Sequence, residues 1–244
     1  MGLRKFPKAL ALGLLMTMLL SLTGCLYPDD QQAGKNVSAR EAVLTVQDAV
    51  DRYQEKTGVL PIQNAEDKVP LYEKYKIDFG KLKRMNFISQ VPSAAFESGG
   101  DYQFLIIDEE TKPLVKLIDL AMFQTLSGVQ KKVDEYRRNN NSQNPAGEEI
   151  YSDFSLIDFS KLGIKAPKVQ SMYSNQSLNL LVNKNGQVLV DYGIDIAVAI
   201  NKEELKPNEK EDLRRVLIEA SYYVPVRSPV YHWVDNEPKA VLTP

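Results

Sequence analysis

Cysteine and histidine are nearly missing from this chain of 244 residues, which contains one of each, Cys25 and His232. A single cysteine has no partner for a disulfide. One cysteine and one histidine are also too few ligands for the zinc sites that are built on these two residue types. The sequence also lacks a glycine-rich phosphate loop and a G-x-S-x-G nucleophile motif. A catalytic triad would have to use His232, which lies in the apolar stretch VYHWVD and is more simply explained by packing. We expect no cofactor and no metal, and we expect that the protein is not an enzyme.

Long apolar runs are also lacking, with one exception at residues 9–20. This run follows the basic residues Arg4, Lys5 and Lys8 and is shorter than the roughly 20 residues of a membrane-spanning helix, so it fits a signal peptide. It ends in a motif that resembles a bacterial lipobox, Leu22, Thr23, Gly24 and Cys25. In such precursors the cysteine receives a diacylglyceryl group, with acyl chains such as palmitate, and becomes the new N-terminus. The alternative is an ordinary secretory signal that contains a cysteine by chance.

An excess of basic residues is absent as well. The chain from Cys25 onward holds 27 basic and 32 acidic residues, a net charge of −5. Nucleic-acid binding needs a basic footprint, and broad adhesion to anionic lipid headgroups needs basic clusters, so neither is expected. The acyl chains would then hold the protein on the outer, extracytoplasmic face of the cell membrane.

What the sequence does contain is a repeat. IDFGKL at residues 77–82 returns as IDFSKL at residues 157–162, and the pattern V-Q-x-x-V-D-x-Y occurs at residues 46–53 and 129–136. Residues 102–122 and 178–198 each show two apolar runs around a polar turn, with Asn185-Gly186 as a strong turn signal in the second. These landmarks occur in the same order in both copies and predict a tandem duplication. The repeated IDFxKL is expected to be a packing element, with a repeated ligand site as the alternative.

The predicted fold class is α+β, with each copy formed by a long amphipathic helix packed on a β-hairpin. The expected divisions are a signal peptide at 1–24, a lipid anchor and polar tether at 25–37, repeats at 38–120 and 121–204, and a C-terminal helix with short edge strands at 205–244. Ser38 is the expected N-cap of the first helix, Gly58 its C-terminal residue, and Asn208 the N-cap of the last helix. Residues 137–149 are expected to form a polar loop.

Aromatic residues are densest at residues 221–233, SYYVPVRSPVYHW. Tyrosine and tryptophan are common on glycan- and peptide-binding faces because each has an apolar body and a polar edge. We therefore predict a binding surface at Tyr222, Tyr223, Tyr231, His232 and Trp233, with core and rim packing as the alternative for scattered tyrosines.

Two resemblances add to this interpretation. With its LTGCLYPDD segment and the helix VQDAVDRYQEKTGVLPI, the chain resembles small uncharacterised lipoproteins of spore-forming Gram-positive bacteria, which implies membrane anchoring and no particular activity. Residues 49–62, AVDRYQEKTGVLPI, are similar to the end of the long helix of type IV pilins and pseudopilins, which implies a helix packed on a sheet. The pilin leader peptide is absent.

The function expected from the sequence is a non-catalytic envelope interaction or assembly factor that binds a protein or a wall polymer. One alternative is a solute-binding lipoprotein of a transporter, although an alternating βαβ pattern is not visible. The other is a carboxylate-dependent hydrolase of envelope glycans, which would need paired carboxylates in a cleft.

Overall fold

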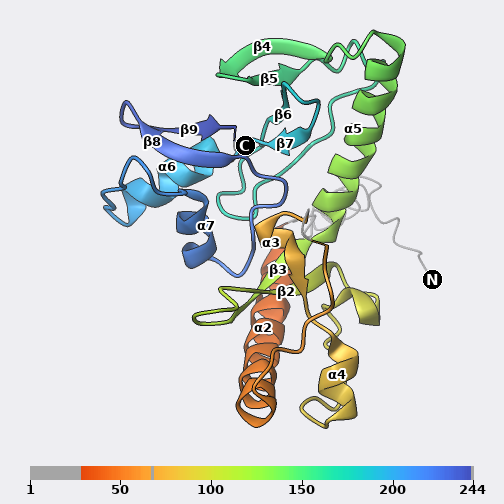
Figure 1. Cartoon of the computed structure of the whole chain (residues 1–244), viewed down its shortest axis with the longest axis vertical. Coiled ribbons are helices and arrows are strands. Elements are labelled where there is room, and N and C mark those ends of the chain that lie inside the picture. Colours follow the sequence, from red (N-terminus) through yellow and green to blue (C-terminus); the bar gives the residue numbers. More distant parts are fainter. Residues whose placement is uncertain (1–28, 67–68, 243–244) are drawn as a thin grey trace, which may run out of the picture. The chain divides into compact units, whose positions relative to one another are not determined.

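The computed structural model describes residues 29–66 and 69–242, so the predicted signal peptide and lipobox lie outside the described residues. The chain divides into two compact units, residues 1–39 and 40–244. The first described helix, α2 (Asp29–Thr57), begins in the first unit and continues into the second. All other described elements belong to the second unit (Figure 1).

The first half of the second unit is a helix combined with a small antiparallel sheet. The sheet has the order β1 (Tyr75–Lys76), β2 (Tyr102–Ile107) and β3 (Leu114–Asp119). The short elements are α3 (Leu71–Lys74), α4 (Phe79–Arg84) and the 3-10 turn η2 (Phe96–Ser98). As the 3.6-residue spacing predicts, one face of α2 is buried, through Val43, Val46, Val50 and Tyr53.

The second half begins without a linker, because Asp119 ends β3 and caps helix α5 (Leu120–Asn139) by accepting a hydrogen bond from the Met122 N–H at 2.8 Å. A four-stranded antiparallel sheet follows, in the order β4 (Ala146–Tyr151), β5 (Phe154–Ile157), β6 (Leu180–Asn183) and β7 (Val188–Val190). Helix α5 lies against β7.

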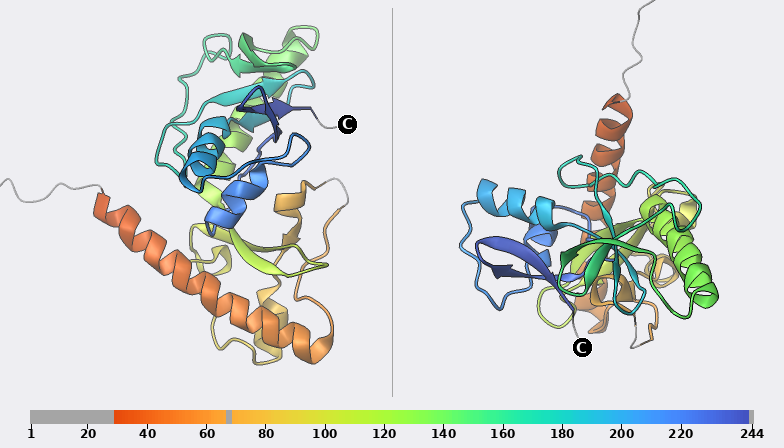
Figure 2. Two further views of the ribbon diagram at one scale, coloured as in Figure 1. Left: turned by 90° about the vertical axis from the view of Figure 1, so that its left-hand side faces the viewer. Right: turned by 90° about the horizontal axis from the view of Figure 1, so that it is seen from above.

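The C-terminal region contains α6 (Gly193–Lys202), α7 (Arg214–Ala220) and a hairpin of β8 (Val230–Val234) and β9 (Glu237–Val241). Helix α6 packs on α7 and on β9 (Figure 2). Residues 222–227, here called the strap, join both sheets. On one side Leu117 of β3 donates to Tyr222 O at 2.9 Å, and on the other Val190 of β7 donates to Arg227 O at 3.0 Å.

The predicted α+β class is confirmed, since the described residues form six α-helices and three antiparallel sheets. Both predicted hairpins are present, as β2–β3 and β6–β7. Gly58 follows the end of α2 with φ of +72°, the left-handed conformation that glycine adopts without strain.

The repeated phrase IDFxKL makes equivalent contacts in its two positions. Lys81 donates through Nζ to Ile62 O, and Lys161 donates to Ala146 O, both at 2.7 Å. The N–H of the Asp in each phrase also bonds to a proline carbonyl, Asp78 to Pro61 at 2.7 Å and Asp158 to Pro145 at 2.8 Å. In the first copy Ile77, Phe79 and Leu82 are buried, whereas in the second Ile157 is buried and Phe159 and Leu162 are half-buried. The phrase therefore acts in packing, and the duplication remains our interpretation of these matches.

Several element boundaries differ from the prediction. Helix α2 begins at Asp29 rather than after Ser38, so residues 29–37 of the predicted tether are helical. Residues 29–57 contain no proline, and nothing in them forces the helix to start later. Residues 146–149 belong to β4 rather than to a loop.

Two predictions for the C-terminal half were also wrong. Residues 193–198, expected to end a hairpin, begin helix α6 because the apolar run GIDIAVAI is long enough for a helix with one buried side. Asn208 and Glu211 do form the predicted capping contact at 3.4 Å, but it stabilises a turn, and α7 begins at Arg214.

Candidate functional site

The predicted lipidation residue Cys25 and the recognition residues Leu22, Thr23 and Gly24 lie outside the described residues. None of the helices in the described part of the chain has the length and hydropathy that a membrane crossing requires.

The predicted aromatic surface is largely part of the core. Tyr223 lies in the strap, is 7% exposed and packs its ring 5.6 Å from the ring of Tyr102. Tyr222, His232 and Trp233 are half-buried, and Trp233 packs against the main hydrophobic core. Two of the five predicted surface residues, Tyr223 and Tyr231, therefore belong to the core, and the other three are partly covered.

Tyr231 is fully buried, so it does not lie on a surface. Its hydroxyl donates to Asp191 Oδ1 at 2.8 Å and accepts from the Tyr192 N–H at 2.8 Å. The Tyr151 hydroxyl donates to the same carboxylate oxygen at 3.0 Å. Burial, followed by the charge of Asp191, raises the pKa of Tyr151, so its hydroxyl remains a proton donor.

Next to this network, a groove of about 730 Å³ opens between β4, the start of α6 and β9. We call it the C-terminal groove. Tyr151 lies on its wall beside Gly193, where a Cβ atom would come within 2.7 Å of the Tyr151 hydroxyl oxygen. A side chain at Gly193 would therefore displace the Tyr151 hydroxyl from its present position.

Exposed apolar side chains are found in the C-terminal groove and on the helix that borders it. Ile150 of β4 and Val234 of β8 line it with exposed fractions of 39% and 40%. On α6, whose Ala197 lines the groove, Ile194 and Val198 are 49% and 44% exposed. Contiguous exposed apolar groups are typical of interaction surfaces. Sequence reasoning missed them, although six apolar residues beside one acid in GIDIAVAI, more than one buried helix face needs, were an available signal.

The polar groups near the C-terminal groove are mainly acidic. Glu237 lines it, and the exposed residues Glu148 and Glu149 precede Ile150 on β4. Lys239 also lines it but is paired with Asp235 at 3.3 Å. In addition, β4 is an edge strand of its sheet, and β9 pairs only with β8 among the described strands.

A second group of cavities lies beside the first sheet and the start of α5, and one of its two members extends to the C-terminal region. One, of about 380 Å³, is lined by Ile118, Leu120 and Phe123 among others, and its neighbour, of about 270 Å³, is lined by Arg214 and Arg227 among others. Pro70 and Glu73 line both. We call the two together the inter-module cleft.

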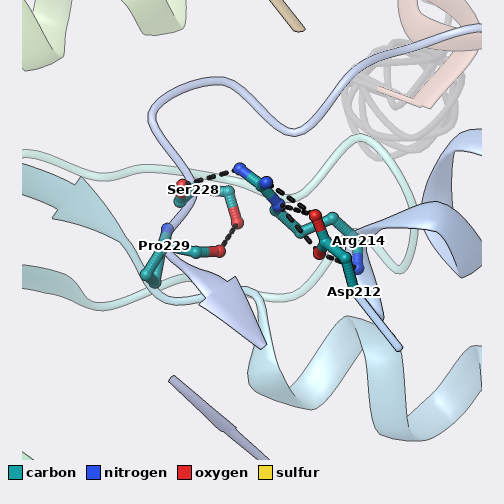
Figure 3. Close-up of polar contacts among 4 residues, drawn as sticks. All are labelled: Asp212, Arg214, Ser228 and Pro229. Atoms are coloured by element: carbon teal, nitrogen blue, oxygen red, sulfur yellow. Dashed lines mark hydrogen bonds and ion pairs between the residues drawn. The ribbon is translucent and has the colours of Figure 1, made fainter. Parts of the chain in front are cut away.

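Arg214 is held in place inside this cleft. Its Nε donates to both carboxylate oxygens of Asp212 at 3.0 Å, and its Nη1 donates to Ser228 O at 3.4 Å (Figure 3). Its guanidinium also stacks over the ring of Tyr72 at 4.9 Å. Arg214 is thus neutralised by a bidentate partner and closes one wall of the cleft.

One buried carboxylate has a structural role. Asp195 of α6 is 1% exposed and accepts hydrogen bonds from the hydroxyls of Ser171, at 2.7 Å, and Ser174. Burial raises its pKa, while the two serine hydroxyls act in the opposite direction. These contacts fasten the turn at residues 171–174 to α6.

Few carboxylates line the two sites in the part of the chain that the structure describes. The C-terminal groove is lined by one acidic residue, Glu237, and the inter-module cleft by one, Glu73. Within residues 29–66 and 69–242, no group of three or more His, Cys, Asp or Glu side chains is arranged to hold a metal ion.

In comparison with known protein families, residues 39–119 match the model of the YphF family N-terminal domain, which is consistent with an uncharacterised bacterial family. The match lies one residue inside each end of the first predicted repeat, residues 38–120. No curated protein and no solved structure matches the chain.

Proposed function

We propose that the protein is a lipid-anchored, non-catalytic interaction factor on the outer face of the cytoplasmic membrane. The lipobox-like motif at Leu22–Cys25 supports the anchor, and the lipoprotein resemblance of the N-terminal sequence agrees with it. The similarity of residues 49–62 to pilins predicts only that a helix packs on a sheet, and the proposed function does not depend on it.

The observation that carries the interaction proposal is the pair of exposed apolar side chains that line the C-terminal groove, Ile150 and Val234. Two more exposed apolar side chains, Ile194 and Val198, lie on α6, the helix that supplies Gly193 and Ala197 to the same groove. Such side chains lose contact with water when a partner covers them, which contributes about 25 cal/mol per Å² of apolar surface. A monomer gains nothing from keeping them together on its surface.

The partner's chemistry follows from the groove. Edge strands β4 and β9 offer backbone groups to an added extended segment, and the nearby acids Glu148, Glu149 and Glu237 favour basic side chains. We therefore propose that the partner is another envelope protein that inserts an extended segment with apolar and basic residues. The alternative is that the partner is a wall polymer, and the experiment described next distinguishes the two.

The test is crosslinking in intact cells followed by capture of the protein and mass spectrometry. The Ile150→Glu/Val234→Glu variant should lose the partner, because it places charges in the apolar groove. The matched control is Leu44→Glu/Val59→Glu, two side chains of the first half that are 52% and 58% exposed. If both variants recover the partner equally, the partner does not bind in the C-terminal groove. Deleting residues 207–244 is a poor test, because it removes the strap and α7 from the core.

A solute-binding role is the second candidate because of the inter-module cleft. The carboxylate-dependent hydrolase has less support, since each of the two sites has a single lining acid.

A further inference from the structure

The inter-module cleft combines an apolar and a charged compartment. The larger cavity, about 380 Å³, is walled mainly by apolar side chains, including Val69, Ile118, Leu120 and Phe123. The smaller, about 270 Å³, contains Arg214 and Arg227. Together they fall within the size range of small-molecule sites, and such sites are common between structural units.

Arg227 connects the two compartments. Its guanidinium lies 5.3 Å from the ring centre of Phe123, which lines the larger cavity, while Arg227 itself lines the smaller one. Its backbone N–H donates to Glu73 Oε1 at 3.1 Å, and its φ is +48°. The main chain of Arg227 is thus fixed from the opposite wall of the cleft.

Among the described residues the Arg227 guanidinium makes no ion pair, since the nearby Glu73 carboxylate accepts from its backbone N–H, whereas the Arg214 guanidinium is paired with Asp212. Lys76 adds a further positive charge to the larger cavity, and Glu73 is the one acid that lines the cleft in the described part of the chain. The three basic residues Arg214, Arg227 and Lys76 stand against two acidic residues. These are Glu73 and Asp212, the partner of Arg214, so the cleft carries one net positive charge. Guanidinium groups held on an aromatic ring are well suited to carboxylate and phosphate groups.

We propose that the inter-module cleft binds an anionic amphiphile, whose aliphatic part fills the apolar cavity and whose carboxylate or phosphate head pairs with Arg227. This ligand site is independent of the C-terminal groove, and either can fail without the other.

The test is isothermal titration of the full chain in nanodiscs of zwitterionic lipid, with empty nanodiscs as the blank for partitioning. The probes are decanoate, decyl phosphate, decanol and decyltrimethylammonium. At least one anionic probe should bind at least tenfold more tightly than decyltrimethylammonium, and the tighter of the two identifies the head group. Equal binding of anionic and cationic probes, or no binding above the blank, would overturn the proposal.

Two variants locate the ligand. Arg227→Gln should weaken binding of the anionic probe at least tenfold and leave decanol unchanged, while Leu120→Trp should fill the apolar cavity and abolish binding of both. Arg84→Gln, at an exposed arginine of α4, is the matched control and should bind as the original chain does. An intact thermal transition in each variant establishes folding. Unchanged anion binding in a folded Arg227→Gln protein would contradict the assignment.

Discussion

Gln47 of helix α2 holds the start of strand β3 by accepting a hydrogen bond from the Val115 N–H on its side-chain oxygen, at 2.7 Å. Its side-chain nitrogen donates to Pro113 O in the same hairpin at 3.1 Å. Gln130 of α5 makes the same contact with the Val188 N–H of β7, at 2.8 Å. In both halves, one glutamine therefore fixes the position of a hairpin against a helix.

Replacing either glutamine should destabilise the protein. Gln47→Ala and Gln130→Ala each leave the backbone N–H of a buried valine, Val115 or Val188, without its acceptor, at an expected cost of about 1–3 kcal/mol in the free energy of unfolding. Urea denaturation measures this loss. Gln54→Ala, on α2 but without such a side-chain bond among the described residues, is the control. If Gln47→Ala is as stable as the control, the glutamine contact does not stabilise the fold.

Much of the fold could be predicted from the sequence because its signals are local. The valine spacing at 43, 46 and 50 defines the buried face of α2, and Asn185-Gly186 defines the turn of a hairpin. Element boundaries were less predictable than the elements themselves. Asp119, for example, is both the last residue of β3 and the cap of α5, so one residue ends a strand and starts a helix.

The candidate sites were harder to predict because they are formed by distant segments. The C-terminal groove is lined by residues from β4, α6 and β9. The composition of each segment does not predict that the three lie close together. Aromatic density at residues 221–233 was misleading, because Tyr223 and Tyr231 contribute to the core. Arg227 was not singled out, since its role depends on Phe123 and Glu73, both more than 100 residues away.

Lys116 gives a prediction about pH. It is 8% exposed, and its Nζ donates to the carbonyls of Ile218 and Ser221 at the end of α7, at 2.7 and 2.6 Å. Burial, followed by the nearby charge of Arg215, lowers the pKa of Lys116 to about 8. Its value in the unfolded chain is 10.5, so between these two pH values the unfolded chain holds more protons.

The free energy of unfolding of the original chain, relative to that of Lys116→Met, should therefore rise between about pH 8 and pH 10.5, by up to about 3 kcal/mol. Below pH 8 the difference should be constant, because Lys116 is then charged in both states. Denaturation of both proteins across this range measures the effect. A difference that stays flat, or falls, as pH rises would show that burial does not disfavour the charge.

Tyr231→Phe should affect stability rather than partner binding. Loss of the hydroxyl removes one donor from Asp191 and leaves the buried Tyr192 N–H without an acceptor, at an expected cost of about 1–3 kcal/mol. Thermal denaturation and partner capture should be measured together. Tyr136→Phe, whose hydroxyl makes no such bond among the described residues, serves as the control. Loss of partner capture by a stably folded Tyr231→Phe protein would show that this hydroxyl contributes to partner binding and not to stability alone.

Cys25→Ala tests the anchor. Without the thiol that accepts the diacylglyceryl group, the protein should remain an unprocessed precursor or leave the membrane. Metabolic labelling with a radioactive fatty acid and fractionation of cells measure both effects. Ser38→Ala, outside the motif, should be labelled normally. Persistent lipid labelling of the Cys25→Ala protein would show that the lipobox interpretation is wrong.

The most direct test of the interaction proposal is site-specific photocrosslinking in living cells, with benzoylphenylalanine placed at Val234. The control position is Val59, which is at least as exposed but lies in the first half of the chain. We predict one protein adduct of defined mass from position 234 and none from position 59. No adduct from position 234, or the same adducts from both positions, would contradict a partner bound in the C-terminal groove.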